Sequence, residues 1–482
     1  MIANLKPYAA YKDSGVPWLG QVPEHWEVLP GRTVFREIND RGHPDEQMLS
    51  VTITRGVLRQ ADLLAESSKK DSSNEDKSNY KLVQPGDLVY NKMRAWQGAV
   101  GVSTYRGIVS PAYIVQRLRS TENLPRYMHF LLRTPLFASE AERWSYGITS
   151  DQWSLRAEEF KCIYFSLPSL PEQTAIVRFL DWAERRIHRV IRARKKRIKL
   201  LEEYKQVLIH QAVTGKIDVH TGKPYPAYKD SGVEWLGKVP EHWEVRKLRA
   251  LFTGAGSGTT PSGEEFYGGD IPWVVTGDLN DSVLTNTTRA VNARALETFS
   301  ALRLYPKDSL IVAMYGATIG KTAILGIEAC TNQACCVLAE PRRGVLVRYI
   351  QSAVISAKEY LVRQGYGGGQ PNINSEIVHS LRIPVPPCRE QTAIVEYLDA
   401  QMAKIDVAIA IARREIELLR EYRTRLIADV VTGKVDVREV AARLPEEPPE
   451  EEAEFMETEE TAEGEATDDA SAEAFPDEEV EP

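Results

Sequence analysis

The segment KPYAAYKDSGVPWLGQVPEHWEV at residues 6–28 occurs a second time as KPYPAYKDSGVEWLGKVPEHWEV at residues 223–245. Twenty of the 23 positions are identical, and the two copies lie 217 residues apart. Shared sequence of this length indicates that the chain contains two related halves. A long period with only two copies predicts a duplicated domain and not a solenoid of short repeats.

Two further pairs of segments match at an offset of 218 residues. PEQTAIVRFLD at residues 171–181 matches REQTAIVEYLD at residues 389–399. VLIHQAVTGKIDV at residues 207–219 matches RLIADVVTGKVDV at residues 425–437. The two halves therefore share their edges, whereas the residues between those edges differ.

The second and third shared segments of each half enclose a predicted long helix with a heptad seam. Apolar residues alternate at spacings of four and three along both helices, as in a coiled coil. The first seam comprises Leu180, Ile187, Ile191, Ile198, Leu201, Leu208 and Ala212, interrupted by Glu184, Arg194 and Lys205. The second comprises Leu398, Met402, Ile405, Ile409, Ala412, Ile416, Leu419, Leu426 and Val430, interrupted by Arg423.

These helices are expected to end at Gly215 and Gly433, because glycine commonly follows the last turn of a helix. About 40 residues at 1.5 Å each gives a length of roughly 60 Å. Two seams are satisfied most simply by packing on each other, and the long domain between them favours the antiparallel sense. The alternative is that each helix buries its seam on its own domain.

The sequences between the shared edges predict mixed domains of similar plan. The first contains the strand-like runs VTITRGVL, GDLVYNKM and PAYIVQRL, then the helix-like run LPRYMHFLLRTPLFASEAERW. The second contains IPWVVTGDL, DSLIVAMYG and ACCVLAEP, then RYIQSAVISAKEYLVRQ. The predicted fold class is α/β (α+β), with two globular domains joined by a pair of long antiparallel coiled-coil helices and a pseudo-twofold internal repeat.

The charge is distributed unevenly along the chain. There are 60 Lys and Arg against 68 Asp and Glu, a net charge of −8. Residues 444–482 hold 18 of the acidic residues and no basic ones, so the remaining chain has 50 acidic residues and carries +10. We expect the tail to be disordered, because it cannot bury enough apolar surface to offset its ordering entropy. A positive body suits a polyanionic partner.

Composition also bounds the location. No apolar run approaches the ~18 residues of a transmembrane helix. The five cysteines are too few and too irregularly spaced for a disulfide framework or a zinc site, so we expect free thiols in a reducing cytoplasm.

Three motifs suggestive of catalysis or cofactor binding fail their own requirements. In YGATIGKTA only three residues separate Gly316 from Gly320, whereas a phosphate loop needs four. FTGAGSGTTP leads into a stretch rich in proline and glycine, and not into the helix that a nucleotide or methyl-donor site requires. We interpret His25 and His242, each followed by tryptophan, as packing residues. No catalytic, cofactor-binding or metal-binding residue is therefore assigned.

The loops carry polar, basic and aromatic side chains that suit the reading of DNA bases. Arg and Lys hydrogen-bond to guanine in the major groove, and Asn and Gln to adenine. Each such residue alone is also compatible with an ordinary surface role. The predicted DNA-contacting residues are Lys92, Arg94, Trp96, Gln97, Ser150 and Gln152 in the first half, and Thr276, Asp278, Tyr315, Thr318, Lys321, Gln370, Asn372 and Asn374 in the second.

This organisation resembles the specificity subunits of type I restriction–modification systems, in which two variable target recognition domains alternate with two repeated helical regions. The resemblance covers residues 1–437. PEQTAIVRFLD and REQTAIVEYLD are similar to the Glu-Gln helix openings of that family. GSGTTPSGEEFYGGDIPWVVTGDL resembles its Gly-Thr-Pro entry and Ile-Pro-Trp strand, and GYGGGQPNIN resembles its Gln-x-Asn-Ile loop. The first half departs from the pattern, because SDQWSL stands where that loop is expected.

The resemblance implies a division into domains. They are residues 1–165, the first target recognition domain with the N-terminal repeat segment; 166–219, the first coiled-coil helix; 220–384, the second target recognition domain with its repeat segment; 385–437, the second coiled-coil helix; and 438–482, a disordered acidic tail.

The resemblance also implies the function of a cytoplasmic, non-catalytic DNA specificity subunit without membrane contact. Its expected partners are double-stranded DNA with a bipartite asymmetric target, two adenine methyltransferase subunits, and motor-nuclease subunits. S-adenosylmethionine, ATP and Mg²⁺ would belong to those partners, with no cofactor on this chain. The alternative is a coiled-coil interaction scaffold without sequence-specific DNA binding.

Overall fold

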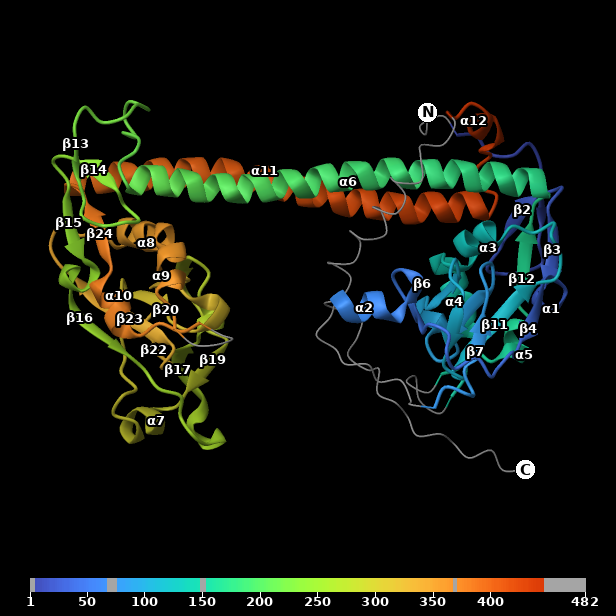
Figure 1. The fold of residues 1–482 in the computed structure, drawn as a ribbon, viewed down its shortest axis with the longest axis horizontal. Coiled ribbons are helices and arrows are strands. Elements are labelled where there is room, and N and C mark those ends of the chain that lie inside the picture. Colours follow the sequence, from blue (N-terminus) through green and yellow to red (C-terminus); the bar gives the residue numbers. More distant parts are fainter. Residues whose placement is uncertain (1–4, 67–75, 148–152, 367–370, 446–482) are drawn as a thin grey trace. The chain divides into compact units, whose positions relative to one another are not determined.

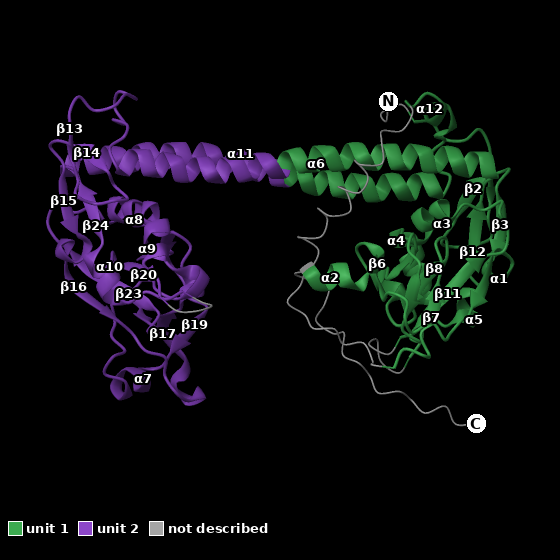
Figure 2. Ribbon diagram, viewed as in Figure 1, with its two compact units in different colours: residues 1–194, 414–482 green, residues 195–413 purple. Residues whose placement is uncertain are grey.

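The computed structural model describes residues 5–66, 76–147, 153–366 and 371–445 (Figure 1). The chain divides into two compact units (Figure 2). Unit 1 comprises residues 1–194 and 414–482, and unit 2 comprises residues 195–413. Unit 1 therefore combines segments from both ends of the sequence, whereas unit 2 is one continuous stretch. Among the described residues, no helix has the length and apolar character needed to cross a membrane.

Two 44-residue helices, α6 (Leu170–Val213) and α11 (Cys388–Val431), confirm the predicted coiled-coil pair. Each unit contains part of both helices. In unit 1 Leu426 and Val430 of α11 share a core with Leu180 of α6. In unit 2 Ile405 and Ile409 pack against Leu208. Every predicted seam residue is buried or half-buried.

The polar interruptions of the seam pair with opposite charges across the two helices. In unit 1 Arg423 Nη2 lies 2.6 Å from Glu184 Oε1, and Arg194 Nε lies 2.6 Å from Glu415 Oε2. In unit 2 Lys205 pairs with Asp406. Within unit 1 the partner number on α11 falls as the α6 number rises, so the helices are antiparallel, as predicted.

Unit 1 is built from short strands and helices around an antiparallel sheet with the order β4-β11-β8-β9. Its strands are β1 (Tyr11–Asp13), β2 (Gln21–Pro23), β3 (Glu27–Pro30), β4 (Phe35–Ile38), β5 (Leu49–Thr52), β6 (Gly56–Arg59), β7 (Lys81–Val83), β8 (Leu88–Asn91), β9 (Val100–Val102), β10 (Gly107–Val109), β11 (Tyr113–Leu118) and β12 (Tyr164–Leu167). Its short helices are α1 (Gly31–Val34), α2 (Gln60–Glu66), η2 (Ala95–Gln97), α3 (Pro125–Leu132), α4 (Pro135–Arg143), α5 (Ala157–Phe160) and α12 (Arg438–Ala442).

Unit 2 contains a sheet with the order β16-β23-β20-β21-β18, in which β18 pairs parallel to β21. Its strands are β13 (Tyr228–Asp230), β14 (Lys238–Pro240), β15 (Glu244–Lys247), β16 (Phe252–Ser257), β17 (Tyr267–Val274), β18 (Ser282–Leu284), β19 (Arg289–Val291), β20 (Leu310–Ala313), β21 (Thr322–Leu325), β22 (Cys330–Thr331), β23 (Cys335–Pro341) and β24 (Arg382–Val385). Its short helices are η4 (Leu248–Leu251), η5 (Glu264–Phe266), η6 (Thr276–Asp278), α7 (Ala293–Thr298), η7 (Gly316–Thr318), α8 (Val347–Ser356), α9 (Lys358–Arg363) and α10 (Ser375–Ser380).

The two sheets have the same strand order, with β4, β11, β8 and β9 matching β16, β23, β20 and β21. The fold class is therefore confirmed. The helix-like run in each half is divided into two helices, α3 with α4 and α8 with α9. In unit 1 the break occurs at Thr134, whose hydroxyl oxygen accepts a hydrogen bond from Phe137 N, followed by Pro135 at the first turn of α4.

The shared edges contact one another within each unit. In unit 1 the Trp26 indole donates to Glu172 Oε1 (3.1 Å) at the start of α6. In unit 2 the Trp243 indole donates to Glu390 Oε2 (2.9 Å) at the start of α11. The ends of the other long helix complete the arrangement, which we call the frame. A Cβ on Gly433 would lie 2.3 Å from Pro23 Cδ.

The predicted boundaries differ from the observed packing in two places. Each long helix is divided between the units and does not form a domain of its own. The predicted disordered tail begins too early at residue 438, because α12 and the residue Leu444 belong to the core of unit 1, where Ala441 and Leu444 are buried. Most of that tail, residues 446–482, lies outside the described residues.

Candidate nucleic-acid interface

In unit 1 two loops meet at the end of the central strand β8. The first is the turn at residues 92–98, which contains η2, and the second is the segment at residues 146–155. Leu155 N donates to Lys92 O (2.8 Å), and the Trp96 and Trp153 rings lie 5.7 Å apart. We call these two segments the loop pair of unit 1.

Unit 2 has an equivalent loop pair at the end of β20, formed by residues 314–321 and 365–374. Ile373 N donates to Met314 O (2.9 Å), which matches the bond between Leu155 and Lys92 in unit 1. Gly316 N donates to Pro371 O (3.0 Å). The same strand order therefore presents two adjoining loops at the same position in both units.

Four predicted residues of unit 1 lie on its loop pair. Lys92, Arg94 and Trp96 are half-buried, and Gln97 is exposed. The Trp96 indole donates to Met93 O (2.9 Å), which fixes the orientation of its ring. Two further predicted residues, Ser150 and Gln152, belong to the same segment of sequence but lie outside the described residues.

The loop pair of unit 2 brings together most of the other predicted residues. Tyr315 is exposed, and Thr318, Lys321 and Asn372 are half-buried. Asn372 Oδ1 accepts from Gly316 N (3.3 Å), so this side chain connects the two loops. The predicted residue Gln370 lies outside the described residues.

The structure corrects two predicted residues. Asp278 is buried, and its carboxylate oxygens accept hydrogen bonds from Val275 N (2.9 Å) and Thr288 N (3.2 Å). A buried anion already bonded to two amides holds a turn and would repel phosphate. The Asn374 side chain accepts from Ile377 N (3.0 Å) and caps α10, so its oxygen has a structural role. Thr276 is half-buried in η6 beside Asp278, away from the turn that follows β20.

Two exposed tyrosines of the loop pairs were not predicted. Tyr146 is 49% exposed and Tyr366 is 57% exposed. Tyr146 is isolated-bridge partner of Ser154, and Tyr366 is that of Asn372, so the two occupy matching positions. The Arg156 guanidinium lies 4.9 Å from the Tyr146 ring centroid. A Tyr-Gly dipeptide in both loops is the signal that could have found them.

The rejected phosphate loop lies in a β-hairpin. Gly320 and Lys321 connect β20 to β21, which pair antiparallel, so no helix follows the motif. The cysteines are free thiols in the structure. Burial raises the pKa of Cys335 and Cys336 to about 12, which keeps both thiols protonated and unreactive at neutral pH.

Known proteins share this sequence and fold. The family model for the type I restriction modification DNA specificity domain matches residues 240–416. A putative type I restriction enzyme MjaX specificity subunit from Methanocaldococcus jannaschii is 24% identical over 443 residues, which cover 87% of this chain and 96% of that protein. The type I restriction enzyme EcoR124I/EcoR124II specificity subunit from Escherichia coli is 26% identical over 199 residues, covering 40% and 46% of the two chains.

The fold has a solved counterpart. A chain from work on the "structural basis underlying complex assembly and conformational transition of the type I R-M system" superimposes with a TM-score of 0.62 at 17% identity, covering 85% of this chain and 98% of that one. The duplicated frame and loop pairs thus define a protein with a DNA specificity domain. The family model, the relatives and the fold together identify the chain as a type I restriction–modification specificity subunit. The relatives are named as specificity subunits, in agreement with the prediction of a non-catalytic protein.

Proposed function

We propose that the chain binds a bipartite, asymmetric double-stranded DNA target, with one loop pair reading each half. The observation that carries this proposal is the equivalence of the two loop pairs in position and their difference in side chains. Unit 1 presents Trp96 against Trp153, whereas unit 2 presents Tyr315 beside Asn372. The same scaffold position with different side chains is what two different half-sites require.

The chemistry of the loops supports contact with DNA. Lysine and arginine can bond to guanine, and amides to adenine, in the major groove. Lys92 and Arg94 in unit 1 and Lys321 in unit 2 supply cations, and Asn372 supplies an amide. The +10 charge of the chain without residues 444–482 favours phosphate binding, which should weaken as salt is raised.

The long helices present a second surface, suited to protein partners. In unit 2 the apolar side chains of Leu200, Tyr204, Val207, Val407 and Ile411 are exposed. Exposed apolar side chains gathered along helices mark interaction surfaces.

Heptad geometry places much of this apolar surface on one side of the helix pair. With Ile198 and Met402 at position a, Leu200 and Ile411 both occupy position c. In an antiparallel pair, equivalent flanking positions face the same side. Glu202 and Arg413, both at position e, lie on the other side, where Arg413 Nη2 is 3.2 Å from Glu202 Oε1.

We propose that this apolar side binds helices of the adenine methyltransferase subunits. In unit 1 Val190, Leu418 and Tyr422 are also exposed. Because the frame occurs in both units, two copies of the same subunit can bind in equivalent ways. The motor-nuclease subunits would join this assembly in the cytoplasm, and S-adenosylmethionine, ATP and Mg²⁺ would be held by the partners.

The test of two independent readers is an exchange of residues 246–383 for the corresponding segment of a related subunit. The exchange should change one half of the methylated target and leave the other half and the partner subunits unchanged. Sequencing of methylated sites in cells with the same methyltransferase subunits measures this. A change in both halves together would refute the proposal.

The partner surface is tested by the double variant Leu200→Asp with Ile411→Asp. Buried charges at these positions should abolish co-purification with the methyltransferase subunit, whereas DNA binding by the chain should persist. Glu202→Ala with Arg413→Ala, on the other side of the helix pair, is the matched control. The alternative, an interaction scaffold, predicts partner binding with equal affinity for target and random DNA.

A further inference from the structure

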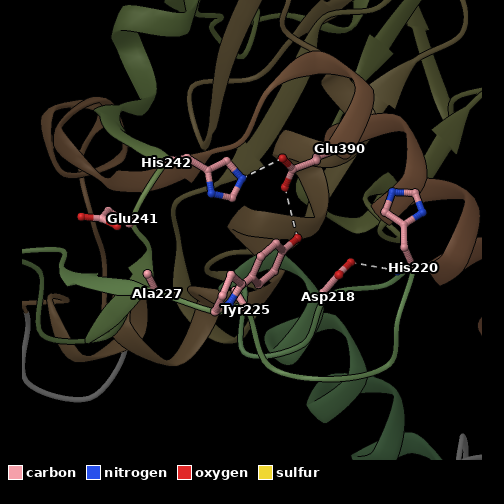
Figure 3. A pocket seen from close by; sticks show the side chains of 8 residues that line it. Asp218, His220, Tyr225, Ala227, Glu241, His242 and Glu390 are labelled. Carbon is pink, nitrogen blue, oxygen red and sulfur yellow. Dashed lines mark hydrogen bonds and ion pairs between the residues drawn. The ribbon is translucent and has the colours of Figure 1, made fainter.

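Unit 2 contains a pocket of about 480 Å³ beside the duplicated segment (Figure 3). Its lining residues are Asp218, His220, Tyr225, Pro226, Ala227, Glu241, His242 and Glu390. The Tyr225 hydroxyl donates to Glu390 Oε2 (3.1 Å), and His242 Nε2 lies 2.7 Å from Oε1. Asp218 Oδ1 accepts from the backbone N–H of His220 (3.0 Å). Two carboxylates thus border an aromatic ring.

The equivalent place in unit 1 contains a guanidinium. Arg438 stands at the position of His220, 218 residues further along the chain. Its Nη2 lies 2.7 Å from Asp436 Oδ2, its Nε lies 3.0 Å from Asp436 Oδ1, and its Cζ lies 5.0 Å from the Tyr8 ring centroid. Arg438 Nε is also 3.9 Å from Glu172 Oε1. The residues of this site therefore hold an arginine where one is available.

The exposure of the two glutamates shows the consequence. The Glu172 side chain is 4% exposed, whereas that of Glu390 is 23% exposed. Among the described residues, no lysine or arginine lines the pocket of unit 2. The acidic segment 444–482 contains no Lys or Arg, so it cannot supply the missing cation.

We propose that the unit 2 pocket binds the guanidinium of one arginine from a partner protein, stacked on Tyr225 and facing Asp218 and Glu390. A planar guanidinium can stack on the ring and bond to carboxylates at the same time, which a lysine ammonium does less well. The Thr221 hydroxyl donates to Asp218 Oδ2 (2.9 Å), but a carboxylate oxygen can accept a second bond. This inference does not rest on DNA reading.

The probe is arginine blocked at both ends, titrated into the full-length chain with ¹⁵N-labelled tryptophan. The indole N–H signals of Trp243 and Trp26 report on the two places, because each indole donates to the local glutamate. In the wild type the Trp243 signal should shift and saturate, and the Trp26 signal should not. Blocked lysine should bind roughly tenfold more weakly or less.

Two exchanges between the units make the test reciprocal. His220→Arg should fill the pocket from within, so that the Trp243 signal no longer responds and the thermal unfolding temperature rises. Arg438→His should open the place in unit 1, so that Trp26 begins to respond. If Arg438→His prevents folding, Arg438→Lys serves instead, and Trp26 should still gain a response to blocked arginine. A wild-type Trp243 signal that ignores blocked arginine, or that responds equally to blocked lysine, would overturn the proposal.

Discussion

The two units keep the same frame with nearly the same distances but differ in their loop pairs. Tyr127 donates to a carbonyl of β12 at 3.0 Å in unit 1, and Tyr349 donates to a carbonyl of β24 at 3.0 Å in unit 2. On the loops, by contrast, Trp96 contacts Trp153, whereas Gly316 contacts Pro371. The difference shows that the repeated residues determine geometry, and that the other residues are free to determine what is read.

If the frames are equivalent, removing the same tryptophan from each should have the same cost. Trp26→Ala and Trp243→Ala should each lower the free energy of unfolding by about 3–5 kcal/mol, because each indole is fully buried. The loss should be confined to the altered unit. Denaturant unfolding followed by hydrogen exchange in both units measures it, and a loss shared equally by both units would contradict equivalence.

If the loops carry the difference, their tyrosines should affect one half of the target each. Tyr366→Ala should weaken binding to one half-site by about 1–3 kcal/mol, and Tyr146→Ala to the other. Stability should change by less than about 0.5 kcal/mol, because both side chains are exposed. The readout is affinity for duplexes altered in one half.

Tyr164→Ala is the control for Tyr146, because Tyr164 is exposed on β12 of unit 1 and lies outside the loop pair. Equal loss of affinity in Tyr164→Ala and Tyr146→Ala would show that the loop has no special role.

Acid should distinguish the units further. In α3 burial, followed by the charges of Arg133 and Arg126, holds the pKa of His129 well below its usual value. The matching residue of α8 is Gln351, which does not titrate. Because the unfolded chain binds the proton first, unit 1 should lose about 1.4 kcal/mol of stability per pH unit as the pH falls below about 6.5.

His129→Gln should remove this loss and leave the stability of unit 2 unchanged. Thermal unfolding from pH 7 to pH 5 compares the variant with the wild type. An identical pH dependence of both proteins would exclude His129 as the cause.

The long helices and the frame were predictable from sequence, because their signals are local or repeated. Heptad spacing revealed the seam, and duplication revealed which segments belong together. The polar interruptions were visible too, but the pairing of Glu184 with Arg423 depends on the relative register of two helices that the spacing alone does not determine. The division of each helix between two units was likewise a result of packing and not of sequence order.

The candidate interface was predicted less completely. Residue types suited to bases located both loop pairs, but type alone cannot show which polar atoms are already bonded to the backbone. Asp278 and Asn374 were selected for their chemistry, and their oxygens hold a turn and a helix end. Tyr146 and Tyr366 were missed, because an isolated tyrosine in a loop is as often buried as exposed.

The closure of the frame has a consequence for the order of folding during synthesis. In unit 2 Asp218 N donates to Lys223 O (2.8 Å), within one short loop. In unit 1 the same bond joins Asp436 N to Lys6 O (2.8 Å), so its two sides are made at opposite ends of translation. Bringing such distant residues together also has a larger entropic cost. Unit 2 can thus close while the N-terminal edge of unit 1, which leaves the ribosome first, waits for the final turns of α11.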